Sequence, residues 1–190
     1  MAFDIVYNQE FVSDFYFDDQ LNYKEYENCT FKNCDFSECK FMNTTFLDCT
    51  FHDCNFKDCE INNVALKTVQ FHGCDFTNVN FARIDQFIMD FHFTNCNLDY
   101  TKYYALKLKG IQFTNCSMVS ADFMETDLTK AMFDNCNLHL AEFERAIAEG
   151  CDFYTSYHIS LDPERTKIKR ATFSKESLPG LLKKYELIIR

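Results

Sequence analysis

The eleven cysteines of this 190-residue chain are the side chains best suited to chemistry, because thiolates bind soft metal ions and enter redox reactions. Six of them follow one another at intervals of 20, 20, 22, 20 and 20 residues: Cys34, Cys54, Cys74, Cys96, Cys116 and Cys136. The ligands of a tetrahedral zinc ion converge on one point, whereas a long constant interval predicts a ladder. We therefore interpret the cysteines as buried packing residues. A thiol-based metal or redox module is the weakest alternative.

Two histidines share the 20-residue interval. His52 and His72 could bind one metal ion together, but position 73 is Gly73 and not a carboxylate, so solvated surface histidines are favoured. The chain has no glycine-rich phosphate loop, no nucleophile elbow and no H-E-x-x-H motif. We expect no enzyme, and therefore no catalytic residue, cofactor, metal or small-molecule substrate.

The elements that must position these groups follow a five-residue period. Large apolar residues recur at every fifth position from Phe31 to Phe81, again from Phe93 to Phe143, and at Phe153, and every cysteine lies two residues before such a central position. Neither the 3.6-residue period of a helix nor the two-residue period of a strand explains this spacing. Two inward residues followed by three outward residues fit a very short strand and a corner.

Four such sides make one coil of 20 residues, the interval that the cysteines show independently. Stacked coils would lie ~4.8 Å apart, so about 7–8 coils would form a rod ~36 Å long. The sequence therefore predicts an all-β solenoid whose thiols and aromatic rings fill a dry axis.

The chain resembles the pentapeptide-repeat family. The A-(D/N)-L-x-x motif of that family appears as Cys34-Asp35-Phe36, Cys54-Asn55-Phe56, Ala121-Asp122-Phe123 and Cys151-Asp152-Phe153, and the resemblance covers roughly residues 9–173. It implies a right-handed quadrilateral β-helix with a solid core. The frequent cysteine, where the family often has alanine, is the main departure.

We divide the chain into three parts. Residues 1–28 form an N-terminal cap and an irregular first coil, in which Phe3, Ile5, Val6 and Tyr7 help to cover the open end. Residues 29–160 form the β-helix. It contains a two-residue insertion near 82–92, because Phe81 and Phe93 are 12 residues apart, and this insertion predicts a bulge or small loop around Arg83–Met89 that keeps the six cysteines on one side.

Residues 161–190 form a connector, a last repeat at Ala171–Phe173 and a short C-terminal helix. Ser177 is the predicted N-cap, Pro179 lies in the first turn, and residues 187–189 are a predicted terminal strand. This ending resembles that of Qnr-type quinolone-resistance and microcin-immunity members, which implies a homodimer. The candidate dimer residues are Leu178, Leu181, Leu182, Tyr185, Leu187, Ile188 and Ile189.

Acidic side chains are the candidate binding surface. The formal net charge is −10, and residues 1–161 carry 11 basic and 25 acidic side chains, a net charge of −14, whereas residues 162–190 carry 8 and 4, a net charge of +4. Duplex DNA carries one charge per ~1.7 Å, so a rod of ~36 Å has roughly two-thirds of the charge density of DNA. The outward carboxylates are Asp35, Glu38, Asp58, Asp75, Asp99, Asp122, Glu125, Asp134, Glu142 and Glu144.

Two functions follow as hypotheses. The Qnr-type resemblance implies a non-catalytic DNA mimic that binds a type II topoisomerase, DNA gyrase or topoisomerase IV, and protects it from quinolones or toxins. The absence of a large loop insertion weakens the case for protection more than that for binding. The alternative is a structural or regulatory scaffold for another protein. Lacking an export signal or a membrane-length apolar segment, the chain is expected to be cytoplasmic, with no direct nucleic-acid and no membrane partner.

Overall fold

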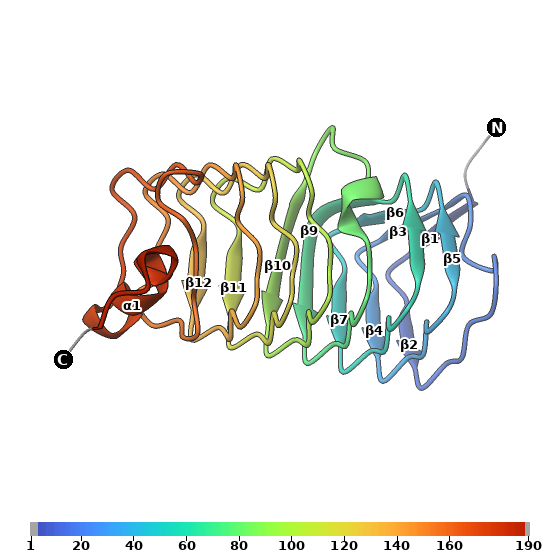
Figure 1. Cartoon of the computed structure of the whole chain (residues 1–190). Helices are drawn as coiled ribbons and strands as arrows, with labels where there is room; N and C mark the ends of the chain where they lie inside the picture. Colours follow the sequence, from blue (N-terminus) through green and yellow to red (C-terminus); the bar gives the residue numbers. More distant parts are fainter. Residues whose placement is uncertain (1–3, 189–190) are drawn as a thin grey trace.

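The computed structural model describes residues 4–188 and shows a right-handed quadrilateral β-helix of about seven turns with a short C-terminal helix, as the sequence predicted (Figure 1). Every strand pair is parallel. The strands are β1 (Asp4–Tyr7), β2 (Glu10–Val12), β3 (Lys24–Glu27), β4 (Thr30–Lys32), β5 (Lys40–Met42), β6 (Thr45–Leu47), β7 (Thr50–His52), β8 (Glu60–Asn62), β9 (Ala65–His72), β10 (Asp90–Thr94), β11 (Gln112–Thr114) and β12 (Met132–Asp134). Shorter segments without strand geometry complete each coil.

The coil has four walls, which we name in chain order by the central residues that stack along them. Wall A contains Phe31, Phe51, Phe71, Phe93, Phe113 and Phe133, which are neighbours in register. Wall B contains Phe36, Phe56, Phe76, Leu98, Met118 and Leu138; wall C contains Phe41, Ile61, Phe81, Tyr103, Phe123 and Phe143; wall D contains Tyr26, Phe46, Leu66, Leu108, Leu128 and Ala148.

The core consists of the two inward residues of each five-residue side. Phe56 and Phe76 stack on wall B with ring centroids 4.5 Å apart, and Phe71 of wall A meets Phe76 edge to face at 5.0 Å. Rings therefore stack along a wall and meet edge to face between walls, which are the two arrangements that aromatic quadrupoles favour. Tyr103 occupies a central position with a fully buried hydroxyl that has no hydrogen-bond partner among the described residues.

Corners between walls depend on a left-handed backbone residue. Asn33, Asn95 and Asn135 have φ values of 52°, 56° and 52°, and the same conformation recurs through most of the coil. Asparagine tolerates this conformation better than most residues with a Cβ. The Asp or Asn between the two inward residues supports the side as well, because its carboxylate or amide oxygen accepts the backbone N–H two residues later, as Asp122 does from Met124 at 2.8 Å.

The predicted insertion lies on wall D. The segment after η1 (Phe81–Arg83) leaves the coil as a small loop and returns at β10, where the register with β9 shifts between Asp90 and Phe91. In Figure 1 this loop rises above the neighbouring corners. The insertion restores the register, because Asp75 pairs with Asn97 and Asn97 with Ser117, so the cysteines beside them stay on wall B.

The two ends of the rod differ from the prediction in several places. Ile5 and Tyr7 do not cover the N-terminal end: they belong to β1, which extends wall D by pairing with β3, and they are 61% and 54% exposed. Val6 packs against the core, and Phe3 lies outside the described residues.

At the C-terminus Phe173 stacks on Phe153 at 5.2 Å, and Thr172 pairs with Asp152. Three short helices follow, η2 (Lys175–Ser177), α1 (Leu178–Leu181) and η3 (Lys183–Tyr185). Pro179 lies in the first turn of α1 as predicted, but the Ser177 side chain makes no capping hydrogen bond. The predicted strand at 187–189 is wrong for its described residues, because Leu187 and Ile188 pair with no strand.

Candidate functional site

The cysteine ladder is confirmed as part of the core. Each thiol on wall B points inward, and the Cys54 Sγ donates to the Phe31 carbonyl at 3.5 Å. Outside the ladder, burial raises the pKa of Cys49 on wall A to about 12 and, with the Asp35 and Asp18 carboxylates, that of Cys39 on wall C to about 11, so these two thiols are protonated at neutral pH. Within residues 4–188 no three His, Cys, Asp or Glu side chains converge to hold a metal ion.

His52 and His72 stack on the outside of wall A with ring centroids 5.0 Å apart. Both belong to wall A strands, because β7 and β9 pair in register and place the two histidines opposite each other. The stack confirms the predicted neighbourhood of the two rings.

The ten predicted carboxylates do not form one surface. Asp35, Glu38, Asp58, Asp75 and Asp99 lie on wall B or at its corner, in the N-terminal half of the rod. Asp122, Glu125, Glu142 and Glu144 lie on wall C in the C-terminal half, and Asp134 lies on wall A. The sequence predicted that all ten carboxylates point outward. It did not assign them to individual walls, because that assignment depends on where the insertion shifts the register.

Ion pairing separates the two acidic groups in part, because two of the four wall C carboxylates have a cationic partner whereas Asp122 and Glu142 form no salt bridge with a described residue. On wall C, the Arg145 guanidinium contacts Glu125 at 2.9 Å, and Arg165 pairs with Glu144. None of the five wall B carboxylates forms a salt bridge with a described residue. The negative charge of these five carboxylates is therefore not compensated by ion pairs within the described chain, and we call these five residues the acidic strip.

Several carboxylates of the acidic strip also stabilise the coil, a role that the sequence analysis missed. Asp35 Oδ1 accepts the Ser37 N–H at 2.9 Å and the Asn55 amide at 3.1 Å, and Asp99 Oδ1 accepts the Val119 N–H at 2.8 Å. The signal was available in the sequence: Asp and Asn alternate at one position of the repeat, as expected where a neutral amide can replace the carboxylate.

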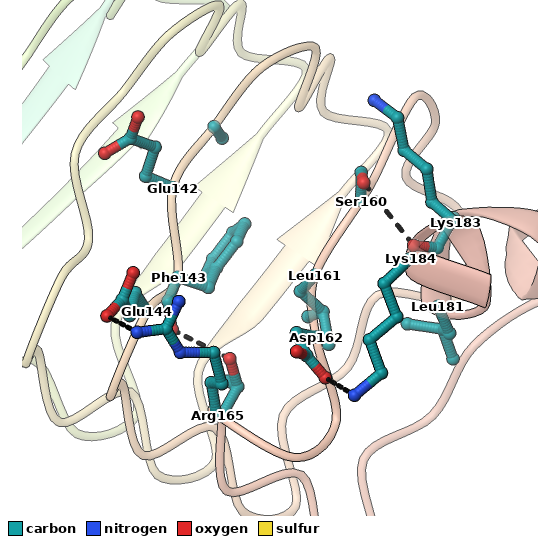
Figure 2. A pocket seen from close by; sticks show the side chains of 13 residues that line it. Glu142, Phe143, Glu144, Ser160, Leu161, Asp162, Arg165, Leu181, Lys183 and Lys184 are labelled. Carbon is teal, nitrogen blue, oxygen red and sulfur yellow. Dashed lines mark hydrogen bonds and ion pairs between the residues drawn. The ribbon is translucent and has the colours of Figure 1, made fainter. Parts of the chain in front are cut away.

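A cavity of about 430 Å³ lies between the last coils of wall C and the C-terminal helices (Figure 2). Phe143, Leu161 and Leu181 form part of its apolar lining. Its charged groups pair across the junction, since Lys184 Nζ contacts Asp162 at 2.7 Å and Glu164 at 2.6 Å. The Lys184 hydrogen bond lowers the pKa of the Asp162 carboxyl. This arrangement holds the C-terminal segment against the coil and presents no nucleophile–base pair.

The candidate dimer residues divide into buried and exposed members. Leu181 is buried against the last coil and Leu182 is half-buried. Leu178, Tyr185, Leu187 and Ile188 are 48%, 51%, 57% and 87% exposed, and Ile189 lies outside the described residues. The exposed members lie between residues 178 and 188, where the exposed charged residues Lys183, Lys184 and Glu186 alternate with them. Separately, none of the helices in the described chain has the length and apolar character needed to span a bilayer.

Comparison with known proteins identifies the repeat. A family model described as a pentapeptide repeat region matches residues 24–87 and 86–157. A search of the curated proteins with this sequence returned no match. Two trypsin-treated forms of QnrB1, a plasmid-mediated fluoroquinolone resistance protein, are similar in structure. One has a TM-score of 0.62 at 17% identity and covers 98% of this chain and 100% of its own; the other has a TM-score of 0.68 at 16% identity and covers 99% and 98%.

A third similar structure is HetL from the cyanobacterium Nostoc sp. strain PCC 7120, a pentapeptide repeat protein involved in heterocyst differentiation regulation. Its TM-score is 0.67 at 10% identity, and the match covers 90% of this chain and 84% of HetL. At these identities the likeness concerns the fold.

Proposed function

Because the chain belongs to the pentapeptide repeat family, we propose that it is a non-catalytic binding protein whose acidic strip imitates the DNA backbone and occupies the DNA-binding surface of a type II topoisomerase, DNA gyrase or topoisomerase IV. The observation that supports this proposal is the acidic strip itself: five carboxylates on one straight wall that are not paired with cations of the described chain. The likeness to QnrB1 agrees with it.

The magnitude of the charge limits the expected affinity. Over the four coils that carry the acidic strip, about 19 Å at the spacing of parallel strands, a DNA duplex carries roughly 11 charges. Wall B carries five acids and Lys57 there, roughly a third of that density. We therefore expect a complex that weakens as salt rises, because exposed charges are screened beyond about 10 Å at 0.1 M salt.

The tests are a supercoiling assay with purified gyrase and a decatenation assay with purified topoisomerase IV. The wild-type protein is expected to inhibit supercoiling and to reduce quinolone-stabilised cleavage. A wall B variant with Glu38→Gln, Asp58→Asn, Asp75→Asn and Asp99→Asn should lose most of the effect. Asparagine keeps an acceptor oxygen at Asp75 and Asp99, and Asn55 and Asn137 already make the turn hydrogen bond of Asp75 on this wall.

The matched control removes the same number of charges from wall C, with Asp122→Asn, Glu125→Gln, Glu142→Gln and Glu144→Gln. It should retain the activity of the wild type, because Arg145 and Arg165 already pair with two of these residues. Equal loss of inhibition in both variants would mean that binding depends on the total negative charge of the protein and not on the acidic strip of wall B. If no concentration of wild-type protein affects either enzyme, the alternative holds: a scaffold for a different protein, to be identified by pull-down from the host.

We propose further that the protein acts in the cytoplasm as a homodimer joined through its C-terminal segment. The exposed side chains of Leu178, Tyr185, Leu187 and Ile188 support this arrangement, and the pairing of Lys184 with Asp162 and Glu164 fixes their position on the coil. Leu187→Glu combined with Ile188→Glu should convert a dimer into a monomer in sedimentation equilibrium. A wild type that sediments as a monomer at all concentrations would refute the proposal.

A further inference from the structure

The loop of the insertion projects two apolar side chains from wall D. Phe87 is 88% exposed and Ile88 is 48% exposed. The base of the loop is held in place, because the Asp85 N–H donates to the Val64 carbonyl at 2.9 Å, the Phe87 N–H donates to Asp85 Oδ1 at 2.9 Å, and Met89 packs against the core. A loop that is held in place and exposes an aromatic ring to water is a candidate site for contact with an apolar surface outside the protein.

Beyond the loop, the same wall is basic. Wall D continues through the central positions Leu108, Leu128, Ala148 and Ile168, and its outward and corner positions carry six exposed cations: Lys107, Lys109, Lys130, Lys167, Lys169 and Arg170. We call these residues the basic strip. They lie on the wall opposite the acidic strip and in the other half of the rod, so the two strips occupy opposite walls at opposite ends of a chain whose net charge is −10.

Acidic groups on wall D reduce this charge without cancelling it. Asp127 pairs with Lys109 at 3.2 Å, Glu149 lies between the lysines, and Asp85 and Asp90 flank the loop. Asp90 in turn contacts His92 at 3.5 Å. Toward the N-terminus wall D becomes acidic at Glu25, Glu27 and Asp48, so a contact with anions is confined to the half between the loop and the C-terminal end.

We propose that wall D is a docking surface for an anionic lipid membrane, with Phe87 and Ile88 inserted among the headgroups and the basic strip lying on the charged surface. An apolar tip beside a cluster of lysines combines the two contributions that hold peripheral proteins on anionic bilayers. The sequence predicted no membrane partner because no segment is long enough to span a bilayer, a criterion that does not concern peripheral contact.

Two other polyanionic partners fit the wall less well. Single-stranded nucleic acids bind where aromatic platforms are interleaved with cations, whereas the outward residues of the basic strip include no aromatic ring. Protein interfaces are depleted of lysine and have an apolar centre, whereas this wall has five lysines and Ile147 as its one outward aliphatic residue beyond the loop.

The chain contains no tryptophan, which provides a direct reporter. Phe87→Trp should show a blue-shifted emission on addition of phosphatidylglycerol-containing vesicles and no shift with pure phosphatidylcholine vesicles. Lys169→Ser combined with Arg170→Ser in this background should lower the partition coefficient about 20–30-fold, since each charge near an anionic surface contributes about fivefold. Added salt should also lower the partition coefficient, because it screens the attraction between the basic strip and the anionic headgroups.

Phe15→Trp is the matched control, because Phe15 is 68% exposed and lies on wall B. Its emission should not change. In flotation without a reporter, Phe87→Ser should reduce binding by at least about tenfold, while Lys57→Ser on wall B should not reduce it. Circular dichroism identical to that of wild type shows that each variant is folded.

Three outcomes would overturn the proposal: no partition into anionic vesicles, equal partition into neutral ones, or a blue shift at position 15 equal to that at position 87. Binding of short duplex DNA or of polyglutamate to the basic strip in the absence of vesicle binding would assign the wall to another partner class. None of these measurements involves a topoisomerase, so their result is independent of the role proposed for wall B.

Discussion

Walls B and D have the same backbone and the same inward geometry, but they differ in the atom that fills their first inward position. On wall B this residue is usually cysteine, and on wall D Thr44, Thr126 and Thr166 occupy it. Both kinds donate to the carbonyl 23 residues earlier: the Cys116 thiol to Phe93 at 3.8 Å, and the Thr126 hydroxyl to Tyr103 at 2.7 Å.

The comparison teaches that a thiol and a hydroxyl can replace each other as the donor at the first inward position, which also accepts the aliphatic side chains of Val64, Leu106 and Ala146 on wall D. Ser156 confirms this on wall B itself, because it follows Cys136 in the ladder and donates to Phe133 at 2.8 Å. The fold is therefore fixed by inward residues that are interchangeable between walls. The outward residues, acidic on wall B and basic on the second half of wall D, are free to determine binding.

The largest effects are expected from the central positions of both walls. Phe76→Ala on wall B should cost about 3–5 kcal/mol of unfolding free energy and Leu128→Ala on wall D about 2–5 kcal/mol, because each leaves a cavity in a sealed core. Phe76 should cost more, since it also loses its stack with Phe56. Urea unfolding followed by circular dichroism measures both. A cost below about 1 kcal/mol at either site would contradict a dry axis.

Two glycine corners test how the walls are joined. Gly110 has φ +71° and open space where an added methyl group would lie, so Gly110→Ala should cost about 1 kcal/mol, as a left-handed residue does. Gly73 has φ +66°, and a Cβ there would collide with Asp53 Oδ1, the end of an exposed side chain that can turn away, so Gly73→Ala should cost about 1 kcal/mol and slightly more than Gly110→Ala. Thermal unfolding of the pair should preserve this order, and the reverse order would show that the corner entering wall B is less crowded than described.

The inward donors can be compared directly. Thr126→Val removes the hydroxyl at nearly constant volume and should cost about 1 kcal/mol, because the buried carbonyl of Tyr103 loses a donor. Cys116→Ser should cost less than about 1 kcal/mol, since a serine already occupies this ladder at Ser156. If Cys116→Ser proved the more damaging change in urea unfolding, the thiols would have a role that packing does not explain.

On wall C, which lies between walls B and D, one substitution is expected to increase the free energy of unfolding. Tyr103→Phe removes a buried hydroxyl without a partner among the described residues and should stabilise the protein by about 0.5–1 kcal/mol. A higher midpoint in thermal unfolding would confirm this expectation. A lower midpoint would mean that the hydroxyl is bonded in solution.

The periodicity predicted most of the fold because each side of the coil repeats one local pattern. Phe31 to Phe81 and the cysteine interval determined the number of sides, and the 12-residue gap before Phe93 located the insertion. The ends could not be predicted in this way, since Ile5, Tyr7 and Leu187 lie where the pattern stops and where tertiary contacts decide whether an apolar residue is covered.

The candidate site was predicted only in part for a different reason. The outward position of Asp35 or Glu142 follows from the repeat, but whether its charge is available depends on partners one coil away. Arg165 compensates Glu144 from 21 residues along the chain, whereas nothing equivalent among the described residues faces Asp75. The basic strip was missed because the charge was summed over residues 1–161 and over residues 162–190. The cationic residues were not assigned to walls.

Competition with DNA tests the central claim most directly. Fluorescently labelled protein bound to purified gyrase should be displaced by a short DNA duplex, and its apparent Kd should rise in proportion to the duplex concentration, with the wall B variant binding weakly from the start. An apparent Kd that does not change as duplex is added would show that the acidic strip and DNA occupy different surfaces, and would contradict the account.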